Sequence, residues 1–146
     1  EIGFLDGEGG SVRLADFRGE TLVVNFWATW CAPCVAEMPS LDRLARATRE
    51  DGVRVVAIAV GSDTTEQITA FYDRLGIEAL EIYRDPTSRS LPAFRAYGLP
   101  TTVLIDDGGN WVGTLSGAAE WDSPEALALV GADTRPVARG SWWAGP

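Results

Sequence analysis

The feature that most constrains the fold is a nearly unbroken apolar run that leads directly into two closely spaced cysteines. The run, Thr21 to Trp27, is rich in branched and aromatic residues, as in a strand buried on both faces of a sheet. Cys31 and Cys34 follow at once. From Cys34 onward, apolar residues recur at helical spacing: Val35, Met38, Leu41, Leu44 and Ala45. The pattern therefore predicts a cysteine pair at the junction of a buried strand and a helix.

Strand and helix signals continue to alternate along the chain. Turn-forming residues at 6–10, between short apolar segments, predict a hairpin at the beginning. A second buried strand is expected at 54–60, and helical spacing follows over 64–75 until Gly76 stops it. Residues 80–83 alternate as in a strand. The later elements, in chain order, are a short helix through 93–97 that ends at Gly98, a hairpin of strands 101–105 and 111–115, and a last helix over 125–130.

This order of elements predicts an α/β fold with a mixed central sheet and helices on both faces. A chain of 146 residues, 46% of them hydrophobic, is long enough to bury one core without several disulfides or a structural metal. We find no internal repeat and no linker that would divide it, and no clear period from Ala132 onward. We therefore expect a single domain over residues 1–131 and a C-terminal tail over 132–146.

The charge of the chain argues against whole classes of partner. The formal net charge is −9, and every basic residue is Arg, with no stretch that gathers them into a stripe. Phosphate backbones and anionic lipid would be repelled, so we expect no nucleic-acid partner. The longest apolar runs, such as Val55 to Val60, are too short to span a bilayer.

The cysteine and histidine content removes further mechanisms. The chain contains no His, which excludes histidine-based acid-base catalysis, and its only cysteines are Cys31 and Cys34. A tetrahedral zinc site needs two more Cys or His ligands, which only a dimer sharing two such pairs could supply. A purely structural disulfide is also disfavoured, because the stabilisation grows with the loop that is closed and this loop is very short. The pair is better explained by redox chemistry.

The position of the two cysteines predicts a different role for each. At the start of a helix, unpaired backbone N–H groups and the helix dipole stabilise a thiolate on Cys31, which makes it the expected nucleophile. Cys34 lies one turn further in and is the expected resolving thiol. Pro33 fixes the turn between them, and neither it nor Ala32 adds charge, which favours a reductant over an oxidant. We expect no cofactor beyond a redox-active Cys31–Cys34 disulfide.

Two neighbours of the pair are candidate functional residues. Glu37 follows Cys34 by three residues and so projects near it on the same helix, where a partly buried carboxylate could exchange protons with the resolving thiol. The alternative is a solvated glutamate that the helix dipole favours in the first turns. Trp30 is expected to shape the rim of the site and shield the disulfide, although simple packing would give the same sequence.

Several separated motifs together resemble the TlpA-like thioredoxins. They are NFWATWCAPC at 25–34, EMP at 37–39, GLPTT at 98–102 with LID at 104–106, and GAAEW at 117–121. The resemblance runs from about Phe4 to Val130 and includes the extra helix and strand before Pro100. It implies a thioredoxin-like fold with an N-terminal hairpin and an inserted βα unit.

The resemblance also implies further site residues. In that family the proline matching Pro100 is cis and lies beside the cysteine pair, so that the backbone of Leu99 pairs with an extended substrate segment. From the residues alone, Pro100 is an ordinary proline at the start of a strand. With Trp30 and Pro33, these two residues are the expected substrate-binding set. In ordinary thioredoxin a buried aspartate occupies the place of Asn25, so the role of base falls here to Glu37 or to water.

The activity implied by the resemblance is the reduction of particular protein disulfides during cytochrome c or copper oxidase assembly. The implied substrates are an apocytochrome or a copper-delivery protein, and the implied electron donor is an integral-membrane thiol relay. We expect a monomer. The implied location is the periplasm, and anchoring through a removed N-terminal segment is compatible with a chain that begins at Glu1.

Two other functions remain open from the residues. A peroxidase on a related fold uses a lone cysteine after a Thr-containing loop, so the tight pair argues against it, and peroxide consumption would discriminate. A Cu(I)-binding assembly factor could use the same pair, because paired thiolates suit Cu(I), with Met38 as the only thioether; titration of the reduced protein with metal would test it. Trp142 and Trp143 in the tail either anchor a partner or fold back, and we assign them no role.

Overall fold

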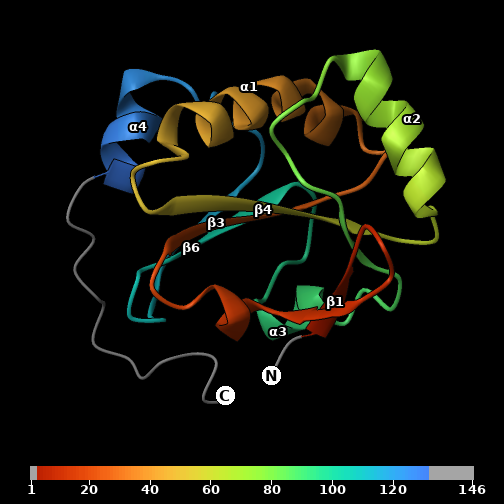
Figure 1. Cartoon of the computed structure of the whole chain (residues 1–146), viewed down its shortest axis with the longest axis horizontal. Helices are drawn as coiled ribbons and strands as arrows, with labels where there is room; N and C mark the ends of the chain where they lie inside the picture. Colours follow the sequence, from red (N-terminus) through yellow and green to blue (C-terminus); the bar gives the residue numbers. More distant parts are fainter. Residues whose placement is uncertain (1–2, 132–146) are drawn as a thin grey trace.

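The computed structural model describes residues 3–131, and the predicted tail 132–146 lies outside these described residues. Within them, seven strands form one mixed sheet in the order β2-β1-β5-β4-β3-β6-β7, with helices on both faces (Figure 1). The strands are β1 (Gly3–Asp6), β2 (Ser11–Arg13), β3 (Thr21–Trp27), β4 (Val53–Val60), β5 (Tyr83–Asp85), β6 (Thr101–Ile105) and β7 (Trp111–Ser116). The helices are η1 (Leu14–Phe17), α1 (Ala32–Thr48), α2 (Thr65–Leu75), α3 (Ser90–Ala93) and α4 (Pro124–Gly131).

Strand β3 lies near the centre of the sheet and carries the site at its carboxyl end. It pairs in parallel with β4 and antiparallel with β6, which places Asn25 opposite Ala57 on one side and Thr102 on the other. Residues 22–27 are fully buried, as expected for a strand covered on both faces. Trp27 stacks on Tyr72. The strand is therefore a rigid base for the cysteine loop that follows it.

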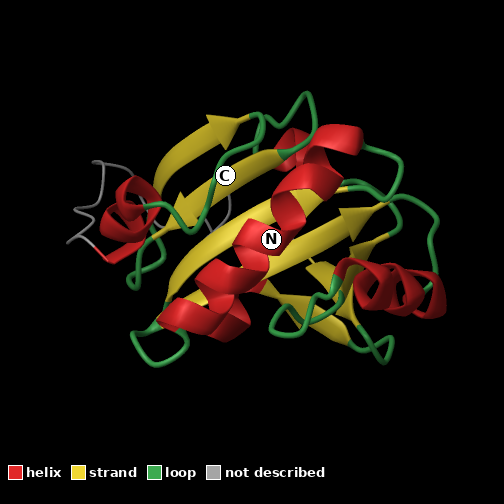
Figure 2. Ribbon diagram, turned by 90° about the horizontal axis from the view of Figure 1, so that it is seen from above, coloured by secondary structure: helices red, strands yellow, loops and turns green. Residues whose placement is uncertain are grey.

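The two parallel connections put α1 and α2 on the same face of the sheet. The crossovers β3–α1–β4 and β4–α2–β5 both run toward the same edge, and right-handed connections then require one common face. In Figure 1, α1, α2 and α4 lie above the sheet and α3 lies below it. Figure 2 shows α1 crossing the middle of the sheet. The expected α/β architecture, with the N-terminal hairpin and the inserted α2–β5 unit, is confirmed.

Most predicted boundaries hold, because local chemistry sets them. Helix α2 begins after Thr64, whose side chain and that of Gln67 each accept a hydrogen bond from the other's backbone N–H, at 3.1 and 2.7 Å. It ends at Gly76, which has a φ of 72°. The last helix begins after Ser123, whose hydroxyl accepts from the N–H of Ala126 at 3.2 Å.

Two short elements differ from the prediction. The strand predicted at 80–83 is formed instead by Tyr83–Asp85, because the N–H of Leu80 donates to the Asp42 carboxylate at 3.0 Å and is not available to the sheet. The helix predicted through 93–97 ends at Ala93, since Arg95 adopts a φ of 55° that no α-helix continues. Of the helices in residues 3–131, none is both long and apolar enough to cross a membrane.

Candidate active site

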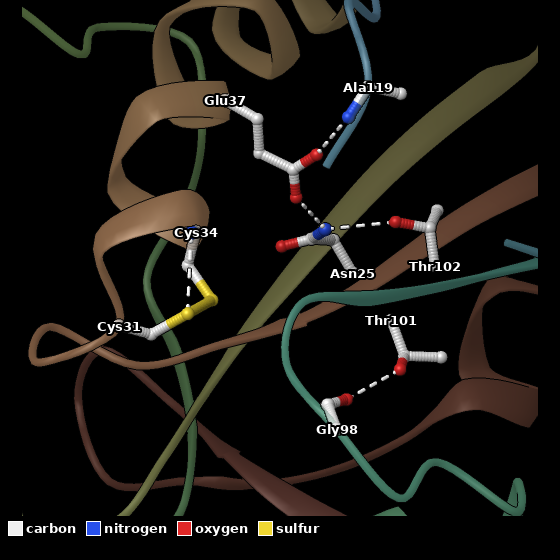
Figure 3. Close-up of a disulfide and its surroundings, with 8 residues drawn as sticks. All are labelled: Asn25, Cys31, Cys34, Glu37, Gly98, Thr101, Thr102 and Ala119. Carbon is white, nitrogen blue, oxygen red and sulfur yellow. Dashed lines mark hydrogen bonds between the residues drawn. A yellow bond between two sulfur atoms is a disulfide. The ribbon is translucent and has the colours of Figure 1, made fainter. Parts of the chain in front are cut away.

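The two cysteines form a disulfide at the start of α1 (Figure 3). Their Cα atoms are 5.3 Å apart. Cys31 is the N-cap of the helix, and its Sγ accepts a hydrogen bond from the backbone N–H of Cys34 at 3.3 Å. The same N–H is placed to stabilise a thiolate on Cys31 once the disulfide is reduced. Cys34 is fully buried, whereas Cys31 keeps 6% of its surface exposed.

A groove of about 510 Å³ lies beside the disulfide and is reached by Cys31 but not by Cys34. Trp30, Cys31 and Pro33 line it from the cysteine loop, and Tyr97 and Leu99 line it from the segment before β6. Among the described residues, no charged side chain lines the groove. The side chains of Trp30 and Tyr97 are 74% and 85% exposed, so two aromatic rings are available to a partner. The groove beside Cys31 is therefore uncharged on its described lining and carries two exposed aromatic rings.

The proline loop lies next to the pair, as the resemblance implied. The Leu99–Pro100 peptide bond is cis, which confirms that expectation. Thr101 closes the loop by donating from its hydroxyl to the carbonyl of Gly98 at 2.7 Å (Figure 3), and the N–H of Gly117 donates to the carbonyl of Pro100 at 2.9 Å. Leu99 is thereby held beside the groove.

Glu37 lies in a buried network one turn after Cys34 (Figure 3). Its side chain is 2% exposed, so the solvated alternative is wrong. One carboxylate oxygen accepts from Asn25 Nδ2 at 2.8 Å. The other accepts from the N–H of Ala119 at 3.0 Å and from Trp121 Nε1 at 2.9 Å. Both oxygens are therefore held away from solvent by donors from β3 and from the segment before α4.

The burial of Glu37 changes its acidity. Loss of hydration raises the pKa of the carboxyl above its ordinary value of 4.5, and the hydrogen bonds from Ala119, Asn25 and Trp121 oppose the rise without cancelling it. A carboxyl with a raised pKa can both hold and release a proton nearer to neutral pH. This property suits the proton-transfer role expected from the sequence.

The raised pKa predicts that Glu37 makes the protein less stable as the pH increases. The folded state keeps its proton to higher pH than the unfolded state, so the free energy of unfolding falls as pH rises from 4.5 through the raised pKa. Chemical denaturation at a series of pH values should show this fall in the wild type and not in Glu37→Gln. Parallel pH profiles for the two proteins would contradict the prediction.

Part of the network was not foreseen from the sequence. Ser40 Oγ donates to the carbonyl of Glu37 at 2.9 Å and accepts from the N–H of Trp121 at 3.0 Å. The GAAEW motif at 117–121, which in the sequence only supported the family resemblance, thus covers Glu37 and donates hydrogen bonds to it. A signal was available: Glu37 precedes Leu41 by four residues and Leu44 by seven, which places it on the buried stripe of the helix.

A second unforeseen contact ties down the cysteine loop. The hydroxyl of Thr29 donates to the carboxylate of Asp63, which lies in the loop between β4 and α2. The guanidinium of Arg84 donates to the carbonyl of Asp63 at 3.4 Å. The inserted βα unit is thereby linked to the loop that carries Trp30 and Cys31.

A disulfide of this spacing, at the start of the helix after a central strand and beside a cis-proline, defines a thioredoxin-like protein. More particularly, the chain belongs to the AhpC/TSA family, which matches residues 2–112.

Individual relatives carry names that describe disulfide chemistry. Over 104 residues the chain is 38% identical to the thiol-disulfide oxidoreductase ResA of Geobacillus thermodenitrificans, covering 71% of this chain and 59% of that protein, so it spans about three fifths of such a relative. It is similar in structure to the pneumococcal exposed lipoprotein thioredoxin Etrx1 of Streptococcus pneumoniae, with a TM-score of 0.73 at 26% identity, covering 88% of this chain and 98% of the other. A thiol:disulfide interchange protein from Chlorobium tepidum gives a TM-score of 0.70 at 25% identity, with 88% and 92% covered.

Proposed function

We propose that this chain is a protein thiol-disulfide oxidoreductase that acts as a dithiol reductant. The observation that carries the proposal is the asymmetry of the pair: Cys31 caps a helix and lines an uncharged groove, while Cys34 is buried behind it. The Cys31 thiolate attacks a substrate disulfide and forms a mixed disulfide. Cys34 then displaces the reduced substrate, so that two electrons pass to the substrate and the Cys31–Cys34 disulfide forms. No cofactor beyond this disulfide is required, and residues 1–131 act as one monomeric domain.

The direction of electron flow is inferred from what is absent around the pair in the described part of the chain. No cation lines the groove, and neither Ala32 nor Pro33 adds a charge that would over-stabilise the reduced form. The reduction potential, measured by equilibration with glutathione or thioredoxin couples, is therefore expected near the thioredoxin value of about −270 mV. A value near about −120 mV would mark an oxidant and overturn the proposal.

The proposed physiological role is that of a TlpA-like thioredoxin. Here the substrates are a disulfide-containing apocytochrome or copper-delivery protein, and the donor is a membrane thiol relay in the periplasm. Support comes from the oxidoreductase name of the ResA relative and from the exposed lipoprotein with the same fold. Partners trapped by Cys34→Ser test this setting, because a resolving-thiol variant keeps its substrate in a mixed disulfide.

Trp30 is proposed to bind the protein substrate. Its ring is exposed at the rim of the groove, so Trp30→Ala removes contact area without opening the core. We expect about a tenfold loss of kcat/KM for a folded protein disulfide, as is typical of an exposed aromatic side chain that a partner buries on binding. The rate with oxidised glutathione should change by less than about twofold, because a small disulfide does not need the rim. Equal losses for both substrates would show that Trp30 acts on Cys31 instead.

Glu37 is proposed to exchange the proton of Cys34 during the resolving step. Its carboxylate oxygens accept hydrogen bonds from Asn25, Ala119 and Trp121, and Glu37 lies one helical turn after Cys34. The pH dependence of mixed-disulfide release should therefore change in Glu37→Gln, while that of the first attack by Cys31 stays the same.

A further inference from the structure

The side-chain amide of Asn25 has a feature that the proposed chemistry leaves unexplained. Asn25 is fully buried. Its Nδ2 donates to Glu37 at 2.8 Å and to Thr102 Oγ1 at 2.9 Å, which uses both of its hydrogens. Its Oδ1 is buried and accepts no hydrogen bond from residues 3–131. A buried acceptor without a partner is costly and rare, so a donor that another state of the protein supplies would stabilise that state.

The orientation of the amide follows from its neighbours. The Glu37 carboxylate only accepts hydrogen bonds when ionised, so the nitrogen of Asn25 must face it and the oxygen must face the other way. In Figure 3 this oxygen points to the side on which Cys34 lies, while the nitrogen points toward Glu37 and Thr102. In the disulfide form the Sγ of Cys34 carries no hydrogen, so it cannot donate to this oxygen.

We propose that Oδ1 of Asn25 accepts a hydrogen bond from the thiol of Cys34 in the dithiol state. The inference rests on the proposed function, because it concerns the reduced pair. Asn25 is thus a positioning residue: it holds Cys34 as a thiol beside Cys31 and joins it, through Nδ2, to Glu37.

The redox step that creates this bond balances. A dithiol donor protein supplies two electrons and becomes a disulfide, and the S–S bond between Cys31 and Cys34 breaks. The donor's two thiols release two protons: Cys34 takes one, which it donates toward Asn25, and the other goes to Cys31 or, where Cys31 stays a thiolate, to solvent. The carbonyl dipole of Asn25 favours the neutral thiol over a thiolate on Cys34, which reserves the thiolate for Cys31.

The surroundings of Asn25 contain few competing groups. Its partners across the sheet are Ala57 on β4 and Thr102 on β6, neither of which titrates. From the first turns of α1 and its N-cap, the titratable groups on the side of Asn25 are Glu37 and the two cysteines. From the segment before α4, Ala119 and Trp121 bind Glu37 through N–H groups that carry no charge.

The test is the infrared S–H stretching band of Cys34 in the Cys31→Ser variant, where Cys34 is the only thiol. We expect the band below the frequency of a free thiol, and at the free-thiol frequency when Asn25→Leu is added. Thr102→Val is the matched control, because it removes only an acceptor of Nδ2 and should leave the band in place. A band at the free-thiol frequency in Cys31→Ser itself, or one that Asn25→Leu does not move, would overturn the proposal. Neither outcome depends on whether the protein reduces disulfides, which is measured separately.

If Asn25→Leu does not fold, a second measurement decides. The chain has only two asparagines, Asn25 and Asn110, so labelling Asn with ¹³C and ¹⁵N gives two side-chain amide signals. On reduction of the wild type, the carbonyl signal of Asn25 should shift, whereas that of Asn110, which binds Asp106, should not. In reduced Cys34→Ala, which lacks the donor, the Asn25 signal should stay at its disulfide-form position. A shift in Cys34→Ala equal to that in the wild type would overturn the proposal.

Discussion

Cys31→Ser should lower the rate of protein-disulfide reduction by on the order of a thousandfold or more, because it removes the thiolate that begins the exchange. The loss is expected to be this large because Cys34 is fully buried and does not line the groove, and so cannot replace Cys31. The rate is best measured in a single turnover, with the reduced protein mixed with a disulfide-containing protein. The fluorescence of Trp30 beside the pair offers a signal.

Cys34→Ser provides the matched control. Its first step should stay within about threefold of the wild-type rate, since Cys31 and its helix N-terminus are intact, but the mixed disulfide should then accumulate. The assigned roles would be reversed if Cys34→Ser lost the first step and Cys31→Ser kept it.

Asp42→Ala is expected to destabilise the fold by about 3–5 kcal/mol, because it leaves several backbone donors without an acceptor. The Asp42 carboxylate is buried and accepts from the N–H groups of Glu78, Ala79 and Leu80, at 3.1, 2.6 and 3.0 Å. It thereby fastens the segment after α2 to the middle of α1. Urea denaturation followed by far-UV circular dichroism would measure the loss.

Two variants separate the backbone contacts from the charge. Arg46 pairs with Asp42 at 3.1 Å but is half exposed, so Arg46→Ala should cost less than about 1 kcal/mol. Asp42→Asn keeps one acceptor oxygen, so its loss in the free energy of unfolding should lie between those of Asp42→Ala and Arg46→Ala. A loss below about 1 kcal/mol for Asp42→Ala would show that water replaces the carboxylate at these N–H groups.

The long elements were predictable because their signals are local. Such signals depend only on residues close in sequence, as in the apolar run Thr21–Trp27 and the capping pair Thr64 and Gln67. The short elements were not. Strand β5 begins only at Tyr83 because Asp42, distant in sequence, holds the backbone before it, and no period along the chain records that bond.

The site divides in the same way. By itself the sequence determined the chemistry, because Cys31 and Cys34 owe their places at the start of a helix to one local junction of strand and helix. Only the tertiary structure decided which side chains surround the cysteine pair. It buried Glu37 under Ala119 and Trp121, and it set Asn25 between Glu37 and Thr102 with a free acceptor on the side of Cys34. The physical reason is that burial and hydrogen bonding of side chains depend on segments up to 84 residues apart, which meet only when the sheet and its helices pack.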